Sequence, residues 1–242
     1  MSVQSVAEGV FSISLAWSNA YLLRDGRNAA LIDTGLYQER ARLLAALSQC
    51  GLRQGDLRAV YLTHAHCDHA GNAAYLGAHG ARLYTHRSEA RFLGKPRRTY
   101  AQAGTHMLRR PLAMLAFLIG EFVFPVHRRN VDMLLHDGDT LDAPGGLLRV
   151  IACPGHTQGH IAFYRDRDGL LFSGDAILNV VPFRRNTALS LPIRALSDDW
   201  DQTIQSARNL ARLKPVRLLA GHGNPLTEDT ARRLLAWTET LI

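Results

Sequence analysis

The chain has 242 residues, 47% of them hydrophobic and 20% charged, with a formal net charge of +7. This composition is ordinary for a globular chain that can bury a full core, and no repeat or low-complexity tract interrupts it. The 3 cysteines, Cys50, Cys67 and Cys153, are too few and too odd in number for a disulfide framework, which excludes the small disulfide-stabilised class. We therefore expect one domain over 1–242 with free thiols.

Short apolar runs typical of β-strands alternate with amphipathic stretches in the first part of the chain. Strands are predicted at 10–15, 20–23, 29–33 and 59–62. Residues 37–52 place leucines on one helical face and reach Gly51, a residue type that commonly ends helices. An alanine-rich helix at 72–80 and a strand near 82–85 complete this part.

The second part repeats the pattern of strands followed by helices. Strands are predicted at 147–152, 161–164, 170–172 and 216–220. Amphipathic helices are predicted near 198–213 and 227–241. Two strand-rich parts, each with helices, predict two sheets packed face to face and covered outside by helices.

The stretch THAHCDH places His64, His66, Asp68 and His69 in one loop between a predicted strand and a predicted helix. Imidazole nitrogens and carboxylate oxygens are ligands of Zn²⁺ and similar cations. Alternate positions of a loop point in different directions, so this stretch could serve two metal ions. Neither set of ligands would be complete, and each ion would need a further protein ligand.

Three later loops, each after a predicted strand, supply candidates for the missing ligands. They are His156 in CPGHTQGH, Asp175 in FSGDA and His222 in AGHG. A carboxylate such as Asp175 can bridge two cations and hold them about 3.5–4 Å apart. The combination of histidines and aspartates at strand exits therefore predicts a metal centre.

In these motifs, and in LIDTG near its start, the chain resembles the metallo-β-lactamase superfamily, without a clear subfamily. The resemblance implies an α/β (α+β) fold, an αββα sandwich of two mixed sheets. It implies two divalent metal ions, with zinc expected and iron or manganese as alternatives. The implied ligands are His64, His66 and His156 for the first ion, Asp68, His69 and His222 for the second, and Asp175 for both. Asp33 and His160 would contact the ligands without binding the ions themselves.

The resemblance also implies hydrolysis by a hydroxide held between the metals, with an ester, a lactone or a related carbonyl compound as substrate. Asp68 and Asp175 are the predicted catalytic residues, because Asp68 could relay a proton to the leaving group and Asp175 would join the metals. Cys67 is expected to be inert. A phosphodiesterase or nuclease, and a mononuclear iron enzyme of the persulfide-dioxygenase type, are the alternatives.

Departures from the sequence patterns of known subfamilies argue against some classes of substrate. Asp175 argues against a true β-lactamase that has the H-x-H-x-D-H motif, because such enzymes usually lack the bridging aspartate. Leu178 stands where lactonases of acyl-homoserine lactones commonly have tyrosine. Only residues 223–242 follow the last histidine, too few for the helical substrate domain of glyoxalase II.

The segment 91–129 is predicted to be a helical insertion or lid, with the apolar run PLAMLAFLIGEFVFPV between arginine clusters. The run contains Glu121 and is too short for a transmembrane helix. A helix packed on the sandwich, a lid for a lipophilic or anionic small-molecule substrate, a homodimer contact and shallow membrane association remain open.

The partners and the location follow from charge and from the N-terminal sequence. Arginine supplies nearly all of the positive charge, but no nucleic-acid module or aromatic stacking platform accompanies it, so a nucleic-acid partner is not favoured. The first residues, MSVQSVAEGVFSIS, lack the basic start, apolar run and cleavage site of a secretory signal. A cytoplasmic location is the expectation.

Overall fold

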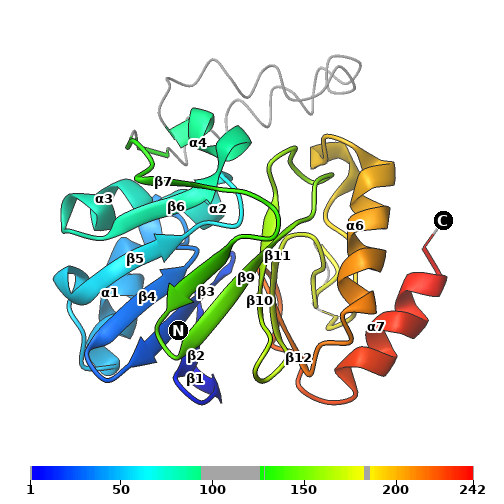
Figure 1. Cartoon of the computed structure of the whole chain (residues 1–242), viewed down its shortest axis with the longest axis horizontal. Helices are drawn as coiled ribbons and strands as arrows, with labels where there is room; N and C mark the ends of the chain where they lie inside the picture. The colour runs from blue at the N-terminus through cyan, green and yellow to red at the C-terminus, as the bar shows by residue number, and fades with distance from the viewer. Residues whose placement is uncertain (1, 94–125, 128, 183–185, 242) are drawn as a thin grey trace.

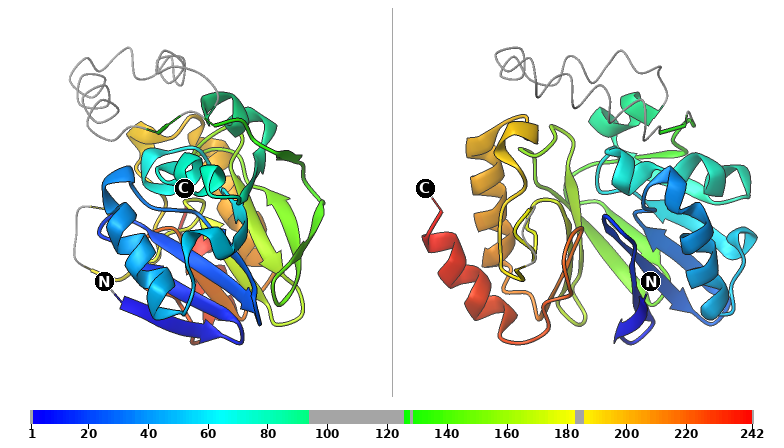
Figure 2. Two further views of the ribbon diagram at one scale, coloured as in Figure 1. Left: turned by 90° about the vertical axis from the view of Figure 1, so that its left-hand side faces the viewer. Right: turned by 180° about the vertical axis from the view of Figure 1, so that it is seen from behind.

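The computed structural model describes residues 2–93, 126–127, 129–182 and 186–241. In this part of the chain two β-sheets pack face to face, and helices cover the outer face of each sheet (Figure 1). Figure 2 shows the same layers from the side and from behind. The predicted αββα sandwich is therefore confirmed.

The first sheet has seven strands among the described residues, and neighbouring strands follow one another in the chain. They are β1 (Ser2–Ala7), β2 (Val10–Ser14), β3 (Asn19–Asp25), β4 (Asn28–Ile32), β5 (Leu57–Tyr61), β6 (Arg82–His86) and β7 (Met133–Leu135). Strands β1 to β4 pair antiparallel, whereas β4 to β7 pair parallel. Parallel neighbours need crossover connections, and these carry α1 (Arg40–Gln49), α2 (Cys67–Ala70), α3 (Ala73–Ala78) and α4 (Arg87–Leu93).

The second sheet has five strands in the described part of the chain, in the spatial order β12-β11-β10-β9-β8. They are β8 (Thr140–Ala143), β9 (Gly146–Ala152), β10 (Ile161–Arg165), β11 (Leu170–Gly174) and β12 (Arg217–Ala220). Strands β8 to β11 are antiparallel, and β12 is parallel to β11. The crossover to β12 contains α6 (Trp200–Arg212), and α7 (Thr230–Glu239) follows β12.

The core of the described residues forms three apolar layers. One lies between the sheets, where Tyr21 of β3 meets Phe172 of β11 edge to face with ring centroids 5.4 Å apart. The other two lie between each sheet and its own helices. Strands β10 and β11 are buried along their whole length, as expected for strands covered on both faces.

Most predicted elements are observed within about two residues of their expected bounds. The helix at 37–52 is shorter than predicted, because a 3-10 turn over Tyr37–Glu39 precedes α1. Strands β1, β7 and β8 were not predicted, and all three lie at sheet edges. β1 has a mostly exposed burial pattern and polar residues, and β7 has only three residues, so neither carries a clear alternation of apolar and polar positions.

The predicted insertion at 91–129 falls mostly outside the described residues, so its helical structure and its role as a lid stay predictions. None of the described helices is long and apolar enough to cross a membrane.

Candidate metal centre

The seven predicted ligands all follow the carboxyl end of a strand. They are His64, His66, Asp68 and His69 after β5, His156 after β9, Asp175 after β11, and His222 after β12. The backbone at the end of β11 turns at Gly174, whose φ is +50°, and a Cβ there would lie 2.7 Å from Oγ1 of Thr63. Glycine therefore allows β11 to end against the loop after β5, which brings ligands from both sheets to one edge of the sandwich.

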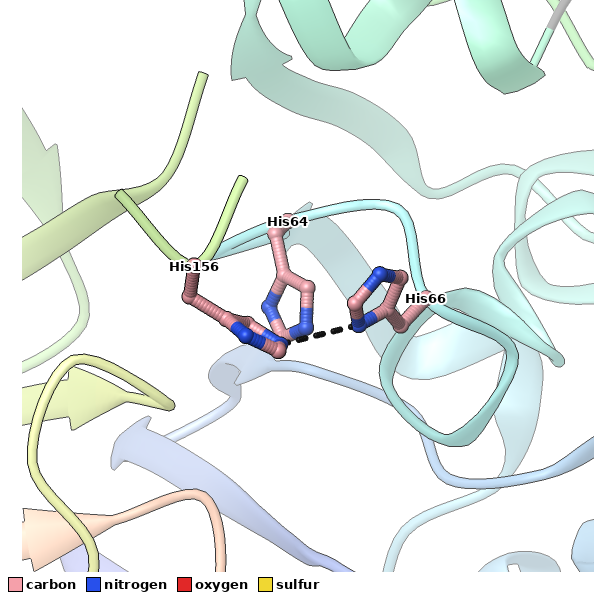
Figure 3. A group of neighbouring side chains, drawn as sticks. All are labelled: His64, His66 and His156. Carbon is pink, nitrogen blue, oxygen red and sulfur yellow. Dashed lines mark hydrogen bonds between the residues drawn. The ribbon is translucent and has the colours of Figure 1, made fainter. Parts of the chain in front are cut away.

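His64, His66 and His156 form the first ligand group, shown in Figure 3. One ring nitrogen from each lies within 4.8 Å of the others. Nδ1 of His66 is 3.0 Å from Nε2 of His156, and two nitrogens that share a tetrahedral zinc ion lie about 3.3 Å apart, given Zn–N bonds of about 2.0 Å. Nε2 of His64 is buried without a hydrogen-bond partner. This donor set fits a metal ion.

Asp68, His69 and His222 form the second ligand group. Nε2 of His69 lies 3.4 Å from Nε2 of His222, and Oδ2 of Asp68 lies 3.4 Å from Nε2 of His222. His69 is fully buried, whereas the side chains of Asp68 and His222 are 24% and 21% exposed. Two side chains of the second group therefore reach solvent.

Asp175 lies between the two ligand groups. Its Oδ2 is 3.6 Å from Nε2 of His156 in the first group and 3.2 Å from Nε2 of His222 in the second. Its Oδ1 is 3.2 Å from Nε2 of His69. One carboxylate thus reaches ligands of both groups.

The two groups differ in charge. Burial and neighbouring imidazoles hold the pKa of His64 and His156 well below the usual range, so both rings are neutral at pH 7. Burial also lowers the pKa of His222, but the carboxylates of Asp175 and Asp68 outweigh burial and raise that pKa to about 10. Burial raises the pKa of Asp68, yet His69 and His222 outweigh it and bring that pKa to about 2. Binding of a cation to the second group would therefore displace protons from its histidines.

Asp33, predicted to support the ligands, directly follows β4 and has a left-handed conformation with φ 57°. Its Oδ1 accepts the backbone N–H of Thr63 at 2.9 Å. Its Oδ2 accepts the Thr63 hydroxyl at 2.9 Å and Nδ1–H of His69 at 2.9 Å. Because the hydroxyl proton of Thr63 goes to Asp33, Oγ1 is left to accept Nδ1–H of His64, 3.0 Å away. This chain of hydrogen bonds leaves Nε2 of both histidines directed at the site.

His160, the other predicted supporting residue, lies behind Asp175. Its Nε2 accepts the backbone N–H of Asp175 at 3.0 Å, and its Nδ1 is 3.1 Å from Sγ of Cys153. Burial lowers the pKa of His160 to about 3, so the ring is neutral and can accept this bond. His160 therefore fixes the backbone that carries Asp175.

Several further residues that were not predicted contact the candidate ligands or their loops, among them Thr63, Ser18, Ser197 and Glu89. Oγ of Ser18 donates to the backbone oxygen of Asp68 at 2.5 Å, and Oγ of Ser197 is 3.4 Å from Nδ1 of His156. Glu89 accepts backbone N–H groups from two ligand-bearing loops. A polar residue in a loop and a glutamate in a helix carry no motif of their own, so the linear sequence held no signal for them.

Comparisons with known proteins identify the family of the chain. A family model described as the metallo-beta-lactamase superfamily matches residues 18–222. The chain is 29% identical to "Probable metallo-hydrolase YflN" of Bacillus subtilis (strain 168), over 93% of this chain and 88% of the relative. It is 27% identical to "Hydroxyacylglutathione hydrolase GloC" of Haemophilus influenzae, over 91% of this chain and 89% of that protein. A solved metallo-beta-lactamase family protein from Thermus thermophilus superposes with a TM-score of 0.76 at 26% identity, covering 97% of this chain and 80% of that chain.

The chain therefore belongs to the metallo-beta-lactamase superfamily, as its motifs predicted. It is an enzyme of the metallohydrolase class. The clustered histidines and aspartates, in a member of this family, imply divalent metal ions as cofactors.

Proposed function

We propose that the protein is a binuclear metal-dependent hydrolase that attacks the carbonyl group of an ester, thioester or lactone. The observation that carries the proposal is the position of Asp175, whose carboxylate lies within 3.6 Å of ligand nitrogens in both groups. A shared ligand of this kind is what a pair of ions about 3.5–4 Å apart requires.

The first ligand group would hold one ion, the second ligand group the other, and Asp175 both. Five imidazoles and two carboxylates form a donor set that suits zinc, with iron and manganese as alternatives. When bound, such ions would lower the pKa of a water molecule to about 7 and polarise the carbonyl oxygen of a substrate.

The residues of the chain supply the rest of the chemistry. Asp68 is partly exposed and lies beside His222, so its carboxylate can accept a proton during attack and return it to the leaving group. Asp33 would orient the ring of His69, and His160 would orient the backbone of Asp175, each through a hydrogen bond. Cys67 belongs to none of the metal-ligand groups found in the described residues, which agrees with an inert role.

Similarity to GloC adds thioesters to the substrate classes. The short tail after His222 was expected to weaken hydrolysis of the glyoxalase II type, but the chain matches a hydroxyacylglutathione hydrolase over 89% of that protein's own length. Two other proteins named hydroxyacylglutathione hydrolase are covered over only 48% and 49% of their length, so the short tail still argues against those longer enzymes but not against one of GloC's size. An acyl group carried by glutathione is a thioester, and we place this class first among carbonyl substrates.

The test is elemental analysis of the purified protein together with a panel of thioesters, lactones, esters, β-lactams and a phosphodiester. We expect about two zinc or manganese ions per chain and turnover in a carbonyl class. Preferred cleavage of bis-p-nitrophenyl phosphate would instead support a phosphodiesterase. One iron ion per chain, with oxygen consumption and no hydrolysis, would support the persulfide-dioxygenase type.

A further inference from the structure

We propose that Glu89 is a positioning residue that fixes the spacing between the two loops of the first ligand group. This inference rests on the proposed metal centre, but not on the identity of the substrate. Glu89 touches neither ion site directly and would act through the backbone of the loops.

The contacts of Glu89 join two segments that are far apart in the sequence. Its Oε2 accepts the backbone N–H of Ala65 at 2.9 Å, and its Oε1 accepts the backbone N–H of Gly159 at 3.0 Å. Ala65 stands between His64 and His66, and Gly159 follows His156 in the same loop. One carboxylate therefore binds the loop of two ligands to the loop of the third.

Glu89 is well placed to act as a rigid clamp. It projects from α4, which begins directly after β6, and it is only 1% exposed. Removal of this buried carboxylate would leave two backbone donors unpaired, which costs more free energy than the loss of an exposed hydrogen bond. The two loops are thus held at one distance rather than a range of distances.

Gly159 packs closely against Glu89 and the start of α4. A Cβ on this residue would lie 2.6 Å from Oε1 of Glu89, 2.8 Å from Nδ1 of His86 and 2.8 Å from Cβ of Ser88. Any larger side chain would push the loop of His156 away from α4. Glycine at this position is therefore a requirement of the clamp, and it offers a second way to open it.

The clamp serves the two ligand groups unequally. The loop of His222 is held by other contacts: Asn179 donates its backbone N–H to the carbonyl oxygen of His222, and the side chain of Asn19 donates to Gly223. Ala65 lies between His64 and His66 and Gly159 follows His156, whereas Asp68 and His69 come later in the same segment as Ala65, in α2. Loss of the clamp should therefore weaken the first ion site more than the second.

Glu39 provides a matched control. It is also a buried glutamate, 6% exposed, and it also accepts two backbone N–H groups, from Ala16 and Leu36. Ala16 shares a loop with Ser18, which contacts Asp68, and Leu36 shares a loop with Asp33, which contacts His69, so Glu39 supports loops beside the second ligand group. Glu39→Gln should cost stability much as Glu89→Gln does, without a selective loss at the first ion site.

The experiment compares zinc affinities in backgrounds that keep one ion site each. His222→Ala leaves the first ligand group intact, and His156→Ala leaves the second intact. Glu89→Gln is added to each, and zinc binding to the metal-free protein is measured by competition with a chromophoric chelator. We expect about 10–100-fold weaker binding in the His222→Ala background, as for other supporting contacts, and little change in the His156→Ala background.

Gly159→Ala should reproduce this selective loss, and Glu39→Gln should not, although melting temperatures fall for each. Equal weakening in both backgrounds, or none in either, would overturn the role of Glu89. If Glu89→Gln does not fold, Gly159→Ala decides by the same measurement. A wild-type chain that binds two ions but hydrolyses no carbonyl substrate would contradict the proposed function and leave the clamp intact.

Discussion

The two ligand groups lie at one edge of the sandwich but are built from different chemistry. The first is a set of three imidazoles, two of them held neutral by burial, and its outer partners include the hydroxyls of Thr63 and Ser197. The second contains a carboxylate, and its buried histidine is hydrogen-bonded to another carboxylate, Asp33. The first group therefore depends on the geometry of neutral nitrogens and on the shared carboxylate of Asp175, whereas the second has a carboxylate of its own, which can attract a cation that displaces the protons of its histidines.

This difference suggests how each group should respond to change. A neutral set of nitrogens loses affinity when the loops that carry them shift, because no net charge compensates for poor geometry. A set with carboxylates loses affinity chiefly when a negative charge is removed. Substitutions that alter charge alone and substitutions that alter position alone should separate the two.

The largest effect is expected where the groups meet. Asp175→Asn keeps the size of the side chain but removes the charge that reaches both groups. We expect turnover to fall by more than about 100-fold, since loss of a direct ligand should exceed the loss of a supporting contact. Metal content should fall as well, by elemental analysis. Asp201→Asn, at an exposed position on α6, is the control, and an active Asp175→Asn enzyme with two ions would contradict the bridging role.

The next prediction separates the two groups. His156→Ala and His222→Ala each remove one ligand from one group, so each variant should retain about one ion per chain instead of about two. Elemental analysis after dialysis measures this directly. If either substitution releases both ions, the groups are not separate sites, and the comparison between them fails.

That the seven candidate ligands lie together was predictable, because these residues follow strands. Four ligands are contiguous in THAHCDH, and His156, Asp175 and His222 each come shortly after an apolar run. Strands β9, β11 and β12 run in one direction, because β9 and β11 are both antiparallel to β10 and β12 is parallel to β11, so the residues that follow these strands lie at one edge of their sheet. The strands that were missed, β1, β7 and β8, lie at sheet edges.

The supporting contacts were only partly predictable. Asp33 and His160 belong to motifs, and each is hydrogen-bonded to a candidate ligand, whereas their role in supporting a metal ion stays a prediction. Glu89 reaches donors 24 and 70 residues away, and the donors are backbone groups, which every residue except proline has. No pattern of side chains could identify that pair. Such contacts depend on where α4 packs, which the sequence alone did not locate.

A smaller effect is expected for Asp33→Asn. The amide that replaces one oxygen cannot accept both the Thr63 hydroxyl and Nδ1–H of His69. We expect about 10–100-fold weaker zinc binding in the background that retains only the second ligand group, measured with the chelator. Thr63→Ser keeps a hydroxyl at the neighbouring position and should bind zinc as the wild type does. Unchanged affinity in Asp33→Asn would show that charge behind the second group is not needed.

The smallest effect is expected for Ser197→Ala, and it completes the comparison. Oγ of Ser197 lies 3.4 Å from Nδ1 of His156, near the upper limit for a hydrogen bond, and it also donates to the backbone oxygen of Ile193 at 3.2 Å. A long contact from a partly exposed loop orients His156 only weakly, so zinc binding to the first group should weaken by less than about 10-fold. The background that retains only the first group gives the measurement. A loss as large as that of Asp33→Asn would mean that the first group depends on its hydroxyl partner as much as the second depends on a carboxylate, and the contrast between a geometric site and a charged site would not hold.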